Sequence, residues 1–244
     1  MCSSDLELLD WGWRVPFAFG LLIGPVGLWI RRHVHEPEVY VEIEKPRHPV
    51  KQLLGSQKRL LAMAIGLMVV STAINYMLNY VPTWATKSLG LPASSAYSAT
   101  LLAGVILTVV TPIGGLLAER VGRERLLWTA LGLLAFTLLP AFWLTSLNMT
   151  PLSLSLLVGW MALLKSLYFS TIPSVMADIF PVSTRASGMS ISYNIAVTIF
   201  GGFAPFICTL LISATGSHFA PGFYLMVTVF LSVAALWHTQ KQLR

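Results

Sequence analysis

The sequence predicts an all-α transmembrane protein, and three observations support this fold class. Hydrophobic residues make up 55% of the 244 residues and charged residues only 11%, whereas a soluble domain carries about 25% charged residues. The mean hydropathy is +0.72. The apolar residues form long runs without charge, and the basic residues lie between those runs. A lipid bilayer is the solvent that suits such a chain, and the same figures exclude disorder and a collagen-like fold.

Seven segments are predicted to be membrane helices, because a spanning helix needs about 20 mostly apolar residues. They cover residues 12–31, 60–84, 98–118, 126–146, 152–177, 188–213 and 222–238. Turn residues at 148–151 and at 214–222 divide the two longest charge-free runs. Pro82 is expected to break the helix 60–84 near its outer end. The first predicted helix is short and begins almost at the start of the sequence.

The distribution of Lys and Arg predicts the orientation, because cytoplasmic loops carry an excess of these residues. With residues 31–59 in the cytoplasm, the opposite side carries only Arg14 and Lys87, and the C-terminus is cytoplasmic. This bias explains the net charge of +6 without a nucleic-acid partner. We expect a multi-pass protein of the plasma (inner) membrane.

Three parts of the chain are predicted: 1–35, a tail and one helix; 36–59, a cytoplasmic linker; and 60–244, a bundle of six transmembrane helices. The linker contains three prolines and mixed charges. It is interpreted as a solvated segment, although its end at 50–60 is also compatible with an amphipathic helix on the membrane surface. Six helices after a linker are typical of the second half of a twelve-helix protein.

The loop at 115–125 reads GLLAERVGRER. Its carboxylate, Glu119, can lie against the positive N-terminus of a neighbouring helix, Gly122 permits a tight turn, and the arginines can bind carboxylates or lipid phosphates. The loop resembles the short-loop signature of the major facilitator superfamily, GxLaDRxGRR, with Glu119 for the usual Asp and Glu124 for a base. An ordinary basic loop between two helices is the alternative. The resemblance implies a cytoplasmic gate made by Gly115, Glu119, Arg120, Gly122, Arg123, Asp178 and Arg185.

Residues 12–17, 21–32, 178–185, 192–196 and 200–205 resemble one branch of that superfamily, the metabolite:proton symporters. This branch includes permeases for α-ketoglutarate, citrate, shikimate and proline or betaine. The resemblance implies twelve helices in two six-helix halves, alternating access and a central substrate site. It covers the C-terminal half of such a protein together with the last helix of the N-terminal half, so the N-terminal half is an expected partner. Since no predicted helix contains Asp or Glu, the proton-coupling carboxylates are expected in that partner half.

Lys165 is the one charged residue near the middle of a predicted helix, and a charge at that depth is costly and usually functional. We expect its ammonium to pair with a substrate carboxylate. The alternatives are a structural ion pair with an acid of the partner half, or a lysine that extends to the interface, which lies about 15 Å away. Tyr168, one turn further on, is expected to line the same site.

Polar side chains on two other predicted helices are expected to face the same cavity. In 60–84, Ser71, Asn75 and Asn79 share one helical face, and Thr72, Tyr76 and Tyr80 form the adjacent one. In 188–213, Ser190, Asn194 and Thr198 form a stripe, and Asn194 is the site candidate. Helix–helix hydrogen bonding is the alternative role for each residue. The predicted substrate-binding residues are therefore Lys165, Tyr168, Asn75, Asn79, Tyr76, Tyr80 and Asn194.

The leading hypothesis is a piece of a secondary transporter that moves a di- or tricarboxylate together with protons. A zwitterion such as proline or betaine is the close alternative, because Tyr76, Tyr80, Trp84 and Tyr168 could form an aromatic cage for a quaternary ammonium. A six-helix membrane subunit that works as a homo-oligomer is a different class of explanation. An embedded enzyme is not favoured, since no HExxH motif occurs. We expect no catalytic residues, no cofactor and no metal site.

Overall fold

The structure, a computed structural model, describes residues 11–33 and 49–243. Residue contacts divide the chain into two compact units, Met1–Lys45 and Pro46–Arg244. The predicted N-terminal tail and most of the predicted linker lie outside the described residues. Within the described ranges all regular secondary structure is helical, which confirms the all-α fold class.

The first unit contains the short 3-10 helix η1 (Gly12–Arg14), α2 (Val15–Leu21) and α3 (Ile23–His33). One helix over 12–31 was predicted, but the structure interrupts it at Leu22. The cause is Pro25, which lies four residues after Leu21, the last residue of α2. Pro25 has no N–H to donate to the carbonyl of Leu21, so the regular hydrogen-bond ladder is broken there.

The second unit begins with a short helix and continues with six apolar helical segments that are long enough to cross a membrane. Its helices are α5 (Pro49–Ser56), α6 (Lys58–Lys87), α7 (Ala93–Val121), α8 (Arg123–Leu147), α9 (Pro151–Phe169), α10 (Ile172–Ile179), α11 (Arg185–Ala196), the π-helix η2 (Val197–Gly202), α12 (Ala204–Thr215) and α13 (Ala220–Leu243). α9 and α10 form one of the six segments, and α11, η2 and α12 form another. The observed helices extend beyond the predicted bounds, because polar end residues continue the helices past the apolar core of each run.

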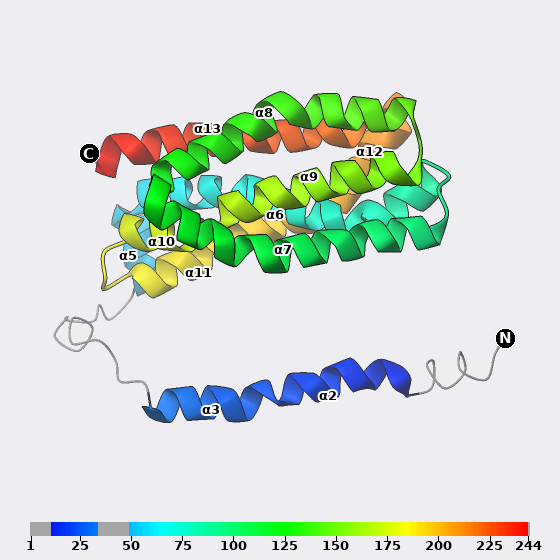
Figure 1. Cartoon of the computed structure of the whole chain (residues 1–244). Coiled ribbons are helices and arrows are strands. Elements are labelled where there is room, and N and C mark those ends of the chain that lie inside the picture. The colour runs from blue at the N-terminus through cyan, green and yellow to red at the C-terminus, as the bar shows by residue number, and fades with distance from the viewer. Residues whose placement is uncertain (1–10, 34–48, 244) are drawn as a thin grey trace. The chain divides into compact units, whose positions relative to one another are not determined.

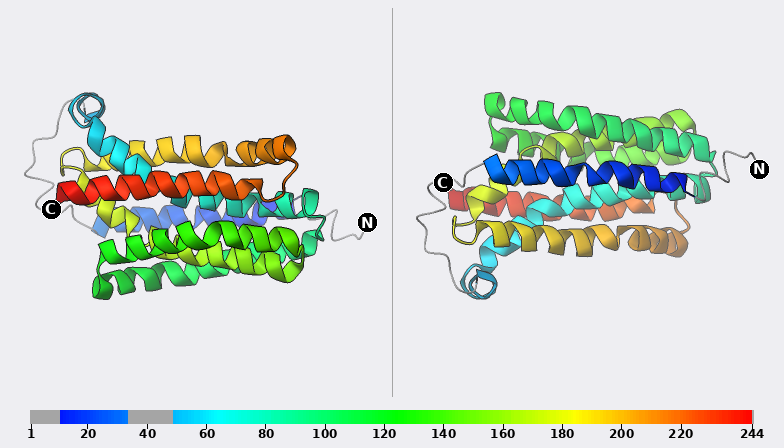
Figure 2. Two further views of the ribbon diagram at one scale, coloured as in Figure 1. Left: turned by 90° about the horizontal axis from the view of Figure 1, so that it is seen from above. Right: turned by 90° about the horizontal axis from the view of Figure 1, so that it is seen from below.

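The helices of the second unit are arranged around α6 and α9 (Figures 1 and 2). α8 and α13 lie side by side along one side, where Trp128 and Trp237 meet edge to face with ring centroids 6.4 Å apart. α7 packs against α9, and α11 packs against α6, on the other side. In the most apolar 18-residue stretch of α6, 67% of the residues are buried. The corresponding share is 17% in α7 and 22% in the α11–α12 segment. Few residues of α7 and of the α11–α12 segment are therefore buried within this unit.

Within the second unit, prolines divide two of the predicted helices, whereas Pro82 does not interrupt its helix. The predicted helix 152–177 is split between α9 and α10 just before Pro173, and the predicted helix 188–213 changes to π-helix η2 shortly before Pro205. Each proline removes one donor from the helical ladder. The predicted break at Pro82 is wrong, because α6 continues through this residue to Lys87. Helix–helix packing can maintain a membrane helix through a proline.

Hydrogen bonds from two neighbouring helices fix the middle of α6. Ser232 of α13 accepts from the Val70 N–H (3.1 Å) and donates to the Gly66 carbonyl (2.7 Å), two groups that a regular α-helix would pair with each other. Tyr168 of α9 donates its hydroxyl proton to the Leu67 carbonyl at 2.8 Å. Hydrogen bonds of this kind hold membrane helices together where lipid supplies no hydrophobic drive for their association.

Candidate functional site

A small polar pocket lies where α6, α9, α11 and η2 meet. Its volume is about 80 Å³. The lining residues are Met68, Ser71, Thr72, Asn75 and Tyr76 of α6, Lys165 and Phe169 of α9, Tyr193 of α11 and Val197 of η2. Ligand pockets usually enclose about 300–1,000 Å³. This pocket can therefore hold one carboxylate-sized group, and a larger ligand would need further walls.

Lys165 is the charged group of the pocket. It is 9% exposed, and its Nζ donates to Asn75 Oδ1 at 3.3 Å. The same Nζ lies 4.8 Å from the centre of the Phe169 ring, which contributes a cation–π attraction. Among the described residues no carboxylate lies within ion-pairing distance of this ammonium. Lys165 thus has donor capacity to spare, since an ammonium carries three N–H groups.

The structure brings three of the predicted site residues together, namely Lys165, Asn75 and Tyr76. Tyr76 is held by close packing, because a Cβ added to Gly201 of η2 would lie 2.6 Å from the Tyr76 ring. Two other predicted residues lie further along α6 and do not line the pocket. Asn79 is exposed, and the Tyr80 hydroxyl is hydrogen-bonded to Thr209 Oγ1 of α12 at 2.8 Å.

Tyr168 and Asn194 lie apart from the pocket. Tyr168 is completely buried, and its hydroxyl is bonded to the backbone of α6. Asn194 is exposed on α11, where its Nδ2 donates to the Ser190 carbonyl of its own helix at 2.8 Å. The geometry gives Tyr168 a contact that anchors α9 to α6, and a ligand role for either residue stays a prediction.

Four pocket residues were missed by the sequence reasoning, namely the aromatic Phe169 and Tyr193 and the apolar Met68 and Val197. Phe169 is four residues after Lys165, so the helical period already places both on one face. Tyr193 is adjacent to Asn194. The predicted stripe therefore began one residue too late on this helix, and one residue corresponds to a turn of about 100° around the helix axis. Tyr193 and Val197, four residues apart, form the face that lines the pocket. The signal in each case was the spacing of four from another pocket residue.

The signature loop forms a tight turn between α7 and α8. Gly122 has φ = 100°, a conformation that residues with a Cβ rarely adopt, and its N–H donates to the Ala118 carbonyl. Directly after the turn, Arg123 forms an ion pair with Asp178 of α10, with 3.0 Å between Nη1 and Oδ2. The two residues are 55 positions apart in sequence, and the structure brings their side chains together.

A second cavity, of about 380 Å³, lies beside this ion pair. The lining residues include Gly115, Glu119 and Arg123 from the predicted gate, together with Pro112, Leu116, Ala118, Ser170, Thr171 and Ser174. Arg120 is exposed at the end of α7 and does not line the cavity. Arg185 begins α11, and its Nε is buried without a hydrogen-bond partner among the described residues. The break between α9 and α10 supplies the hydroxyl-bearing wall of this cavity.

The chain matches the family model of the Major Facilitator Superfamily over residues 8–205. It belongs to this superfamily. The match begins before α2 and extends through η2, so it includes the signature loop, the Arg123–Asp178 pair and the pocket at Lys165. Together with the six apolar helices, the family membership identifies a multi-pass membrane protein.

Several curated transporters are similar over nearly the whole chain. A citrate-proton symporter of Klebsiella pneumoniae is 34% identical over 242 residues, which are 96% of this chain and 53% of the symporter. A citrate-proton symporter of Salmonella typhi is 31% identical over 93% of this chain and 53% of its own length. An ectoine/proline transporter of Corynebacterium glutamicum is 29% identical over 95% of this chain and 49% of its own length. The chain therefore spans about half the length of the curated relatives it matches.

Proposed function

We propose that this chain forms the C-terminal half of a secondary transporter that moves a small carboxylate together with protons by alternating access. The observation that carries the proposal is the buried Lys165 ammonium, held by Asn75 and Phe169 at the wall of a small polar pocket. An ammonium in this position favours a carboxylate ligand, because a charge at membrane depth needs an opposite charge. The two citrate-proton symporters among the relatives support the same substrate class.

The proposed partner of the chain is an N-terminal six-helix half. The pocket of about 80 Å³ is too small for a whole tricarboxylate, and few residues of α7 and of the α11–α12 segment are buried within this unit. A second half placed against these helices would complete the site, as in transporters built from two repeats. The proton-coupling carboxylates belong to that half in this proposal, because the six spans described here contain no Asp or Glu between their end regions.

The proposed location is the plasma (inner) membrane, with the linker and the C-terminus in the cytoplasm. The excess of Lys and Arg in the corresponding segments supports this orientation. The gate then lies at the cytoplasmic end, where the Arg123–Asp178 pair ties α8 to α10. We assign Glu119, Arg120 and Arg185 to the same gate, with partners in the N-terminal half.

A zwitterion such as proline or betaine remains the second candidate, since one relative is an ectoine/proline transporter. The proposed aromatic cage is not assembled in this half. Trp84 is completely buried against Phe142, with ring centroids 5.5 Å apart. The Phe169 ring already holds the Lys165 ammonium. Both observations favour the carboxylate over a quaternary ammonium.

The proposal is tested by reconstitution into proteoliposomes. This chain, which already brings the last helix of the N-terminal half, is combined with the first five helices of the Klebsiella citrate-proton symporter. Uptake of citrate and of proline is measured with and without an inward proton gradient. The expected result is citrate uptake that rises with the gradient and is absent for this chain alone. The symporter's own two halves serve as the positive control. Uptake of proline in preference to citrate would show that the substrate is a zwitterion and not a di- or tricarboxylate. Transport by this chain alone would refute the two-half mechanism.

A further inference from the structure

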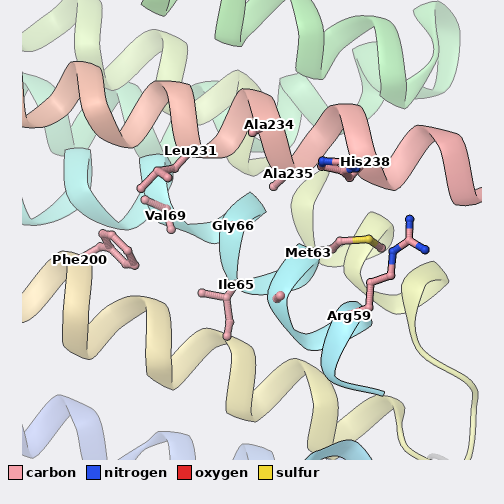
Figure 3. A pocket seen from close by; sticks show the side chains of 11 residues that line it. Arg59, Met63, Ile65, Gly66, Val69, Phe200, Leu231, Ala234, Ala235 and His238 are labelled. Carbon is pink, nitrogen blue, oxygen red and sulfur yellow. The ribbon is translucent and has the colours of Figure 1, made fainter. Parts of the chain in front are cut away.

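A large apolar groove runs along the second unit between α6, α13 and η2 (Figure 3). Its volume is about 700 Å³. The lining residues are Arg59, Ala62, Met63, Ile65, Gly66, Val69, Phe200, Leu231, Ala234, Ala235 and His238. None of them belongs to the pocket at Lys165 or to the cavity beside the Arg123–Asp178 pair. The groove is therefore a separate feature of the surface.

Small residues create the groove. α6 and α13 approach so closely at its floor that a Cβ added to Gly66 would lie 2.5 Å from the Cβ of Ala235. Ser232 secures this contact through its two hydrogen bonds to the α6 backbone. Ala62 and Ala234 line the sides with single methyl groups, so the space beside the contact is left open. The shape follows from the packing of two fixed helices and does not depend on a mobile loop.

The two polar lining residues lie together at one end of the groove. Figure 3 shows Arg59 and His238 at this end, and Val69, Leu231 and Phe200 at the other. Both Arg59 and His238 are exposed, and the lining includes no acidic residue. From Arg59 to Val69 the helix rises about 15 Å, which is about half the thickness of a bilayer core. The groove thus spans a single leaflet and ends at a cationic site at the membrane surface.

We propose that this groove binds an anionic phospholipid of the leaflet on the side of Arg59, which is the cytoplasmic leaflet in the proposed orientation. One acyl chain lies along Met63, Gly66 and Ala235 towards Phe200. The phosphate accepts hydrogen bonds from the Arg59 guanidinium and from the His238 ring. Basic pockets between membrane helices at the cytoplasmic side bind lipid head groups through the same interactions. The occupant is a lipid because the groove is apolar over one leaflet and cationic only at the surface.

The test is a lipid titration of the purified 244-residue chain in detergent, followed by native mass spectrometry. The probes are phosphatidylglycerol and phosphatidylcholine with identical acyl chains. The unmodified chain should bind phosphatidylglycerol at least about five-fold more tightly, the effect of about one basic residue at a membrane surface. Arg59→Gln should abolish this preference. Lys87→Gln removes an exposed cation from the opposite end of α6, outside the groove, and should leave the preference intact.

The acyl-chain part of the proposal is tested with Ala234→Trp, which fills the groove from its exposed side. Binding of both lipids should fall at least about five-fold, whereas Leu133→Trp on the exposed face of α8 should leave it unchanged. An unchanged melting temperature identifies variants that keep the fold. A phosphatidylglycerol preference that survives Arg59→Gln, or lipid binding that survives Ala234→Trp, would overturn the proposal. So would a dimer of the unmodified chain that binds no lipid and dissociates in Ala234→Trp, because the groove would then hold a second copy.

Discussion

The pocket at Lys165 has a volume of about 80 Å³ and a polar wall, whereas the groove at Arg59 has about 700 Å³ and is apolar except at one end. Both are built on α6, and the adjacent residues Met68 and Val69 contribute to different cavities. The difference comes from the helix that faces α6. α9 brings an ammonium to one cavity, while α13 brings alanines to the other. One helix can therefore serve a polar ligand and a lipid through two faces.

The π-helix η2 separates the two regions. Val197 lines the pocket and Phe200 lines the groove. Directly after Phe200, Gly201 lies against Tyr76 and Thr72 of α6. Single-turn π segments occur often at functional sites in helices. A change at Gly201 should consequently affect both regions.

The largest effect on stability is expected for Gly201→Val. The added Cβ would lie 2.6 Å from the Tyr76 ring and 2.9 Å from Thr72 Cγ2, so η2 must move away from α6. Overpacking of this kind costs about 1–3 kcal/mol. We expect a lower melting temperature together with weaker binding of both carboxylate and lipid. Gly202→Ala is the matched control, because its nearest neighbour would be the Val197 carbonyl oxygen at 3.8 Å. Equal melting temperatures for the two variants would contradict the close contact.

A smaller effect is expected for Tyr168→Phe, which separates an anchoring role from a ligand role. The variant loses the hydroxyl that donates to the Leu67 carbonyl, a bond worth about 0.5–1.5 kcal/mol. Thermal unfolding should report this loss, while carboxylate affinity stays unchanged. Reduced affinity at unchanged stability would instead restore Tyr168 to the substrate site.

The smallest effect on stability is expected at the Arg123–Asp178 pair. The side chains are 54% and 55% exposed, and exposed ion pairs contribute at most about 1 kcal/mol. Arg123→Ala should hardly change the melting temperature or the substrate affinity. It should slow the exchange between inward-open and outward-open states, measured by substrate counterflow in the two-half transporter. Normal exchange rates would remove the pair from the gate, and the exchanged pair Arg123→Asp with Asp178→Arg should recover part of the rate.

The sequence was sufficient for the fold class and for the core of the pocket. Charge-free runs identify membrane helices because the bilayer excludes charge, and Lys165 and Asn75 are conspicuous for the same reason. The π-helix and the division of α9 from α10 follow from prolines whose effect depends on packing, as the uninterrupted helix at Pro82 shows. The exact face of a helix is harder to predict, which is why Tyr193 was missed in favour of its neighbour.

The groove could not be predicted from the sequence. It depends on the contact between Gly66 and Ala235, two small residues that are far apart in the chain and are unremarkable in an apolar run. Arg59 and His238 likewise resemble any other basic residues near a helix end. Only the packing of α6 against α13 brings these four residues to one surface.

The central claim is that the Lys165 ammonium binds the carboxylate of the substrate. The most direct test is a binding titration of the two-half transporter with a carboxylate substrate and with its amide analogue, using Lys165→Met and Lys165→Arg. A charge-assisted hydrogen bond contributes about 1.5–3 kcal/mol, so Lys165→Met should bind the carboxylate roughly ten- to a hundred-fold more weakly. It should also discriminate poorly between carboxylate and amide, and Lys165→Arg should recover part of the affinity. Undiminished carboxylate binding by a correctly folded Lys165→Met variant would contradict the claim and leave this lysine with a structural role.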